Sequence, residues 1–165
     1  MALQLTGVNT DYLFAAESND YRRAQLQTII GSATRIYDDA TDARLIMERH
    51  VDVLSATFSC SHYSGVIRNS TPAIRTNEVA LLDQALEYVR AQIRRGTPVQ
   101  WIILENSEGL MLYHFAHMVA VCNLLAALHT NYKWKVQWLC PSRHANIPNA
   151  RPRIYWLGTW LHVAS

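Results

Sequence analysis

The stretch "VQWIILEN", residues 99–106, decides the fold class, because an unbroken apolar run there ends in an acid and an amide. A run of β-branched and apolar residues of this length is typical of a strand covered on both faces. A long amphipathic pattern over residues 76–96 precedes it, with Thr76 able to cap a helix and Gly96 able to end one. A second helical stretch, residues 107–130, follows. Helix, buried strand and helix in succession predict an α/β sheet.

The same alternation extends along the whole chain. Strands separated by helices pair in parallel through crossover connections, so most of the sheet should be parallel. The last two strands are joined by a loop, residues 141–152, and should form an antiparallel pair at one edge. We expect the other strands at 12–17, 33–39, 51–58, 132–140 and 153–163, and the other helices at 20–31 and 41–50.

Length and charge limit the functions that the chain can have. Its 165 residues suit a single domain, which we place at residues 1–165. The net charge of +2, from 15 Lys+Arg and 13 Asp+Glu, is below the basic excess usual in dedicated DNA-binding domains. A nucleic-acid role would therefore depend on local patches, such as residues 149–153. The arginines of residues 90–95 fit better as the solvated end of a helix.

Cysteine usage and the start of the chain indicate an intracellular protein. The three cysteines form no CxxC pair and no disulfide framework, which favours a reducing compartment. No basic segment followed by an apolar segment opens the chain, so we expect no signal peptide. The apolar stretch 109–128 contains two histidines and an asparagine, and it fits a buried helix better than a membrane span.

Polar residues stand where four of the expected strands end. Glu17, the pair Asp38-Asp39, Cys60 and Glu105 each follow an apolar run. Ligands of such sheets bind beyond the carboxyl ends of the strands, where these side chains would share one rim. Each residue alone has a structural explanation, because acids cap helices and a cysteine after an apolar run is usually buried. Four in succession predict a site.

These segments, in this order, resemble the cytosine-5 DNA methyltransferase family from about residue 3 to residue 158. "DVLSATFSCSHYS" (52–64) resembles the strand and loop that present a Pro-Cys-Gln cysteine. "WIILENSEGL" (101–110) resembles the strand that ends in Glu-Asn-Val. "ANIPNARPRIYWLG" (145–158) resembles the Gln-x-Arg-x-Arg motif and the strand after it. "FAAESND" (14–20) and "YDDA" (37–40) resemble the two cofactor-binding strand ends.

The resemblance implies a Rossmann-like S-adenosylmethionine-dependent methyltransferase sheet with helices on both faces, and it implies a chemical role for each motif. Cys60 would be the nucleophile that adds to C6 of cytosine, so that C5 can accept a methyl group. Glu105 would bind the N3 and amino edge of the base, and Arg153 would bind O2. Arg151 would support the same pocket or hold Glu105.

The cofactor and the substrate follow from the same resemblance. S-adenosylmethionine would be bound by Glu17 at the ribose hydroxyls and by Asp39 at the adenine amino group, with Ser18 and Ala40 beside them. DNA is the implied partner, and RNA is the alternative, because a close branch of the family acts on transfer RNA. The target base must leave the stack to be reached.

The chain departs from the family pattern at single positions and in whole segments. Ser59 and Ser61 flank the cysteine where Pro and Gln are usual, Asn149 replaces Gln, and Ser107 replaces Val. The first, central strand with its Phe-x-Gly-x-Gly loop has no counterpart, nor does the C-terminal target recognition region. We expect two half-sheets with unpaired inner edges, and little or no activity of this chain alone.

Other functions remain open at this point. The chain could be one half of a split methyltransferase, completed by a partner chain that supplies the absent motifs, or a non-catalytic module that binds nucleic acid or protein. A cysteine hydrolase using Cys60 and His62 is disfavoured, since two residues along a strand is poor geometry for a general base. His114 and His117 have helical spacing but no evident third metal ligand, so we expect no metal.

Overall fold

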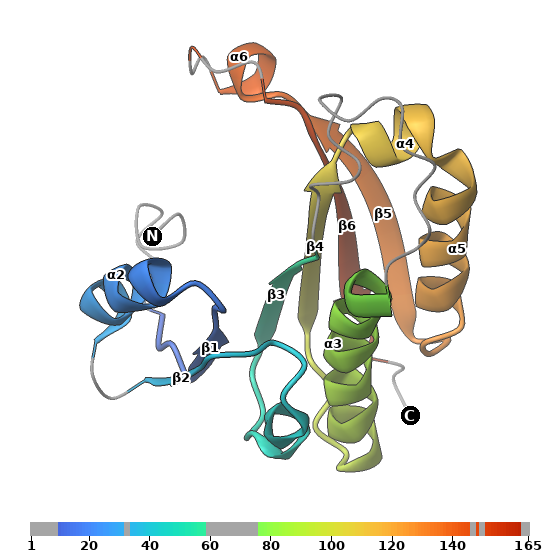
Figure 1. Cartoon of the computed structure of the whole chain (residues 1–165). Coiled ribbons are helices and arrows are strands. Elements are labelled where there is room, and N and C mark those ends of the chain that lie inside the picture. Colours follow the sequence, from blue (N-terminus) through green and yellow to red (C-terminus); the bar gives the residue numbers. More distant parts are fainter. Residues whose placement is uncertain (1–9, 32–33, 59–75, 146–147, 149–150, 163–165) are drawn as a thin grey trace. The chain divides into compact units, whose positions relative to one another are not determined.

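The computed structural model describes residues 10–31, 34–58, 76–145, 148 and 151–162. The described chain is mixed α/β (Figure 1), and it is divided into two compact units, Met1–Arg49 and His50–Ser165. The α/β expectation is confirmed. The single domain over residues 1–165 stays a prediction.

The first unit is a two-stranded parallel sheet with one crossover helix. Strands β1 (Phe14–Ala16) and β2 (Arg35–Tyr37) pair directly, and α2 (Asp20–Ile30) connects them. The side chain of Asn19 caps α2 by accepting from the backbone N–H of Arg22 at 3.0 Å. The helix expected at residues 41–50 is instead a short 3-10 helix, η1 (Ala43–Met47). Only Leu45 of this turn is buried, so little apolar surface is available to hold a longer helix.

The second unit contains a four-stranded sheet in the order β3-β4-β6-β5. Strands β3 (Val53–Thr57) and β4 (Trp101–Ser107) are parallel, and α3 (Thr76–Arg94) lies between them in the chain. Strand β6 (Arg153–Trp160) runs antiparallel to both β4 and the edge strand β5 (Tyr132–Leu139). The antiparallel pair expected at one edge is therefore confirmed, although a short helix, α6 (Pro141–His144), lies in the connection expected to be a loop.

The helix expected at residues 107–130 is two helices. Helix α4 (Gly109–Tyr113) ends at His114, whose φ of −133° and ψ of 45° are not helical, and α5 (Phe115–Ala126) begins after it. Tyr113, His114 and Phe115 are all modest helix formers, which makes this the weakest point of the segment. No helix in the described parts of the chain is both long and apolar enough to cross a membrane.

The core of the second unit lies on one face of its sheet. Ile102, Leu104, Ile154 and Trp156 alternate along β4 and β6 and are almost completely buried. Helix α5 packs on this face, since the indole N–H of Trp156 lies 3.5 Å from the sulfur of Cys122. The intervening residues of β4 and β6 therefore face the opposite side of the sheet, and they include Glu105, Ser107 and Arg153.

The two sheets are not joined by backbone hydrogen bonds among the described residues. Strand β1 pairs only with β2, and β3 pairs only with β4, so each has one edge without a neighbouring strand in the described chain. Two half-sheets of this kind are what the sequence predicts for a sheet without its central strand.

Candidate active site

A carboxylate and a guanidinium form an ion pair where β4 ends and β6 begins. Oε1 of Glu105 lies 2.5 Å from Nε of Arg153, and the two side chains are only 20% and 15% exposed. Arg153 also donates from Nη1 to the carbonyl of Pro152 at 2.9 Å. Charge-assisted hydrogen bonds in a partly buried place hold both groups in fixed positions.

The antiparallel register of β4 and β6 brings these two residues together. Glu105 lies opposite Tyr155, and Ser107 lies opposite Arg153. Glu105 and Arg153 are therefore diagonal neighbours on the same face, within reach of two long side chains. This is the face opposite the core, so the pair points away from the buried apolar residues of the two strands.

A buried amide fixes the end of β4 to the chain that leads to Cys60. Asn106 is fully buried, and its Nδ2 donates to the carbonyl of Phe58 at 3.2 Å. Its Oδ1 accepts from the backbone N–H of Ser107 at 2.8 Å. Asn106 belongs to the motif at the end of this strand, but the sequence alone indicates no role for it. In the structure it holds Phe58, the residue directly after β3, at the end of β4, and the burial of its amide is the signal that the sequence alone lacks.

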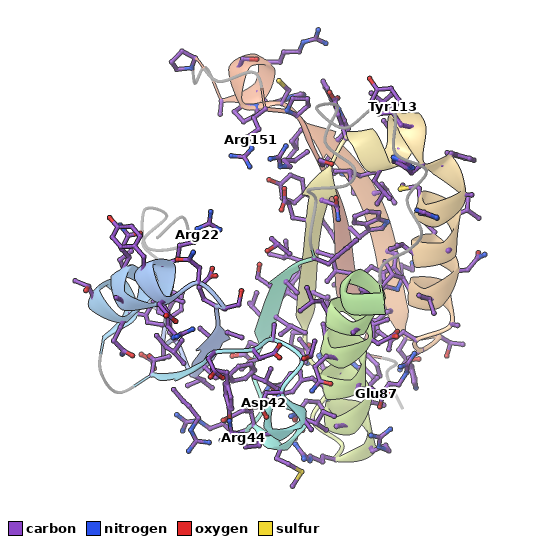
Figure 2. All side chains as sticks on the ribbon, in the orientation of Figure 1. Arg22, Asp42, Arg44, Glu87, Tyr113 and Arg151 are labelled. Carbon is purple, nitrogen blue, oxygen red and sulfur yellow. The ribbon has the colours of Figure 1, made fainter. Side chains whose placement is uncertain are left out.

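Two other expected site residues, Cys60 and Arg151, are not part of this ion pair. Cys60 lies outside the described residues, as do its neighbours Ser59 and Ser61. Arg151 is described and exposed, and Figure 2 shows it near α6 at the same end of the sheet. The ion-pair partner of Glu105 is Arg153, so the role of holding Glu105, which the sequence left open for Arg151, is taken by Arg153.

A described thiol, Cys140, lies near this rim. Cys140 directly follows β5, and β5 ends with Leu139 opposite Arg153. The thiol is buried and lies 3.1 Å from Oγ of Ser142, and hydrogen bonding from that hydroxyl lowers the pKa of Cys140. Any chemistry assigned to a cysteine of this chain must therefore distinguish Cys60 from Cys140.

The expected cofactor residues lie in the first unit, at the ends of two adjacent strands. Glu17 follows β1 directly, and its backbone N–H donates to the carbonyl of Tyr37, the last residue of β2, at 3.0 Å. The Glu17 side chain is partly exposed and accepts from the backbone N–H of Asn19 at 2.9 Å. Ser18, the next residue, is exposed.

Asp39 and Ala40 follow β2 in a turn. Oδ1 of Asp39 accepts from the backbone N–H and the hydroxyl of Thr41, at 2.7 and 2.8 Å, and the carboxylate is exposed. Ala40 is half-buried. Because Ala16 pairs with Tyr37, the two strands end side by side, and both carboxylates stand just beyond their carboxyl ends. Acceptors of this kind suit the hydroxyl and amino donors of a nucleoside.

The described residues contain no group of three potential metal ligands. The rings of His114 and His117 stack with their centroids 5.8 Å apart, at the junction of α4 and α5. This stacking fits a packing role for the two histidines.

Solved structures with the same fold include several methyltransferases. The S. pombe Dnmt2 methyltransferase superposes with a TM-score of 0.63 at 15% identity, over 99% of this chain and 46% of that one. A Spodoptera frugiperda DNMT2 mutant gives 0.67 at 19%, over 96% and 45%, and the Entamoeba histolytica methyltransferase EhMeth gives 0.54 at 14%, over 93% and 46%. The chain thus spans less than half the length of each, and at these identities the likeness shows the fold.

The sequence of the chain shows the family to which it belongs. No curated protein matches the chain. The family model of the C-5 cytosine-specific DNA methylases, however, matches residues 1–161, which is nearly the whole chain. With the α/β fold and these methyltransferase neighbours, the chain belongs to the C-5 cytosine-specific DNA methylase family.

Proposed function

We propose that this chain carries the catalytic motifs of an enzyme that methylates C5 of cytosine in DNA, with Cys60 as the nucleophile. The observation that carries the proposal is the Glu105–Arg153 ion pair, at the end of the strand next to the one that leads to Cys60. A carboxylate and a guanidinium held together in a partly buried place match the two polar edges of a cytosine.

In the proposed reaction the thiolate of Cys60 forms a bond to C6 of the base. Glu105 hydrogen-bonds the N3 and amino edge, which favours protonation at N3, and the electron pair of the C5–C6 double bond becomes available at C5. Arg153 donates to O2 of the base. S-adenosylmethionine, when bound, supplies the methyl group that C5 takes. Loss of the C5 proton to a base then restores the double bond and breaks the bond between C6 and sulfur.

The residues proposed to hold the cofactor are those of the first unit. Glu17 would accept hydrogen bonds from the ribose hydroxyls, and Asp39 from the adenine amino group, with Ser18 and Ala40 alongside. Support comes from the two carboxylates standing beyond adjacent strand ends, which is where ligands of parallel sheets bind.

The substrate in this proposal is a cytosine that has left the helical stack, because C5 and C6 cannot be attacked from both faces inside a duplex. DNA is the substrate that the family description supports. RNA is the alternative, and parallel assays with cytosine in DNA and in transfer RNA distinguish the two.

The proposal includes a requirement for a further strand. Strands β1 and β3 each have one edge without a partner among the described residues, and the family pattern has a strand with a Phe-x-Gly-x-Gly loop between them. A segment or partner chain that supplies this strand would pair with both edges and complete the cofactor site. This chain alone should therefore show little or no methyl transfer.

The test is transfer of tritium from labelled S-adenosylmethionine to DNA. The chain alone and the chain fused to a family segment carrying the strand and glycine loop are compared. We expect transfer by the fusion only, and its loss in Cys60→Ala and Glu105→Gln but not in Cys122→Ala. A folded fusion that binds S-adenosylmethionine and nucleic acid without any transfer would favour the non-catalytic binding module instead.

A further inference from the structure

Trp138, near the end of β5, organises a group of side chains that the proposed chemistry does not use. Its indole N–H donates to Oε2 of Glu108 at 3.1 Å, which fixes the ring against the segment that follows β4. The guanidinium carbon of Arg143 lies over the ring, 5.7 Å from its centroid. The ring of His144 meets the same indole edge-on, with centroids 5.5 Å apart.

Stacking on Trp138 leaves the hydrogen-bonding groups of Arg143 available. A guanidinium uses its flat face for an aromatic ring, while its N–H groups lie in the plane and point outward. Arg143 is exposed, and no carboxylate pairs with it in the described part of the chain. The ring limits the motion of a long side chain, so less entropy is lost when the guanidinium binds a ligand. The available donors form a fork that suits an anionic oxygen pair.

This group lies at the same end of the sheet as the candidate active site. Trp138 pairs with Ile154 and Leu139 with Arg153, so Arg143 follows four residues after the position opposite Arg153. Arg151, labelled in Figure 2, is exposed near α6 at this end as well. Two further cations, Arg143 and Arg151, therefore lie at the end of the sheet where Arg153 pairs with Glu105.

The surrounding chain favours an anionic partner of considerable length. Residues 109–165 contain no Asp or Glu. All of the chain's acidic residues lie at or before residue 108, and all but two lie before residue 105. A basic, aromatic group at the same end of the sheet as a site for a nucleobase fits a phosphodiester backbone, because phosphates flank every base. Of the cations in this segment, Arg143, Arg151 and Arg153 lie at the Arg153 end of β6, whereas Lys133 and Lys135 lie farther along β5.

We propose that Arg143, held on Trp138, binds a backbone phosphate of the nucleic acid whose cytosine lies at Glu105 and Arg153. This inference rests on the proposed function, because it requires nucleic acid at that rim. Glu108 is a positioning residue in this arrangement: it acts on the phosphate only through the orientation of Trp138. An acidic protein partner is the competing occupant of the same cations.

The test is binding of a fluorescent single-stranded oligonucleotide to the full chain, followed by anisotropy at several salt concentrations. Arg143→Gln should weaken binding roughly three- to tenfold at about 0.1 M salt and lower the slope of log K against log salt by about 0.7 to 1. Arg143→Lys should recover part of the affinity, because the charge remains but the planar fork is lost. Trp138→Phe keeps a ring for stacking but loses the bond to Glu108, and it should have a smaller effect than Arg143→Gln.

Lys133→Gln is the matched control. Lys133 is exposed, carries the same charge, and lies on β5 six residues before Leu139, about 20 Å along the strand from the Arg153 end. We expect its affinity and salt slope to stay near those of the unaltered chain.

Three results would overturn the inference. Equal weakening by Lys133→Gln and Arg143→Gln would mean a diffuse charge effect, while the proposed function would stand. Equal competition by polyglutamate and by unlabelled oligonucleotide would assign the surface to an acidic partner. Absence of nucleic-acid binding by the folded chain would remove both the phosphate contact and the proposed substrate.

Discussion

At the scale of single residues, the Glu105–Arg153 pair should matter for stability as well as for chemistry. Arg153→Met leaves the carboxylate of Glu105 without its cation in a place where the pair is about four-fifths buried. We expect a loss of about 1–3 kcal/mol in the free energy of unfolding, measured with urea. The exposed Arg151→Met is the control and should change stability by less than about 0.5 kcal/mol. Equal losses in the two variants would contradict the described pairing.

Truncation of two adjacent buried polar residues, Asn106 and Ser107, should have different effects on the stability of the protein. Asn106→Ala removes the donor to the carbonyl of Phe58 and should cost about 1–3 kcal/mol. Ser107 is also buried, but its hydroxyl has no partner among the described residues. Ser107→Ala should therefore leave the stability unchanged or raise it by up to about 1 kcal/mol. Urea denaturation of both variants measures this, and a large loss in Ser107→Ala would reveal a bond to that hydroxyl.

Tyr132 should make the protein sensitive to alkali. Burial raises the pKa of this phenol, whose hydroxyl donates to the carbonyl of Val99 at 2.7 Å. The unfolded chain ionises Tyr132 near pH 10, while the folded chain keeps it protonated. Its contribution to stability is therefore fully present below about pH 10 and is lost as pH rises above that value.

The measurement is the free energy of unfolding between about pH 8 and pH 11 for the unaltered chain and Tyr132→Phe. The variant should be less stable by about 1–2 kcal/mol at pH 8, because the Val99 carbonyl loses its donor. Its stability should then fall less steeply with pH. Parallel curves would show that Tyr132 ionises equally in both states.

At the scale of elements, the pairing of β5 with β6 depends on a glycine. Gly158 lies opposite Trp134, and a Cβ built there would stand 2.7 Å from Cζ3 of that indole. Gly158→Ala should cost about 1–3 kcal/mol, because the ring must leave the face of the strand. Combining it with Trp134→Leu should recover part of the loss. Thermal unfolding of the single and double variants checks this, and additive losses would mean that the two residues do not touch.

The order and type of most elements could be predicted from the sequence, because the buried strands and amphipathic helices have clear periods. The pairing of β5 with β6 was predictable from a connection whose sequence indicates a loop without a crossover helix. The 3-10 form of η1 was not, since it depends on how little of that segment is buried. The break at His114 was not, because modest helix formers weaken a helix without by themselves ending it. The sequence also predicted Glu105 and Arg153 as one pocket, but only the antiparallel register explains why they pair directly.

The roles of Asn106 and Trp138 could not be predicted from the sequence. Both depend on contacts between residues far apart in the chain: Asn106 with Phe58, and Trp138 with Glu108 and Arg143. A pattern of residue types along one chain carries no information on such distances. The placement of Cys60 stays a prediction, because that residue lies outside the described parts.

At the scale of the whole molecule, the chain divides the proposed reaction between two units. The acids proposed for the cofactor belong to Met1–Arg49, and the proposed catalytic residues belong to His50–Ser165. No backbone hydrogen bond links the two sheets among the described residues. A strand that pairs with both β1 and β3 would make one continuous sheet, which is the physical reason to expect that activity requires it.

The most direct test of this account is mass spectrometry of the chain after incubation with S-adenosylmethionine and an oligonucleotide containing 5-fluorocytosine. Fluorine at C5 blocks the elimination that frees the thiol, so a reacting cysteine stays covalently attached to the base. The chain alone is compared with the fusion that carries the family strand and glycine loop, and Cys140→Ser serves as the control for the thiol that follows β5. We expect an adduct at Cys60 in the fusion, lost in Cys60→Ala and kept in Cys140→Ser, and none in the chain alone. An adduct at Cys60 in the chain alone would contradict the need for a further strand, and a folded, cofactor-binding fusion without an adduct would contradict Cys60 as the nucleophile.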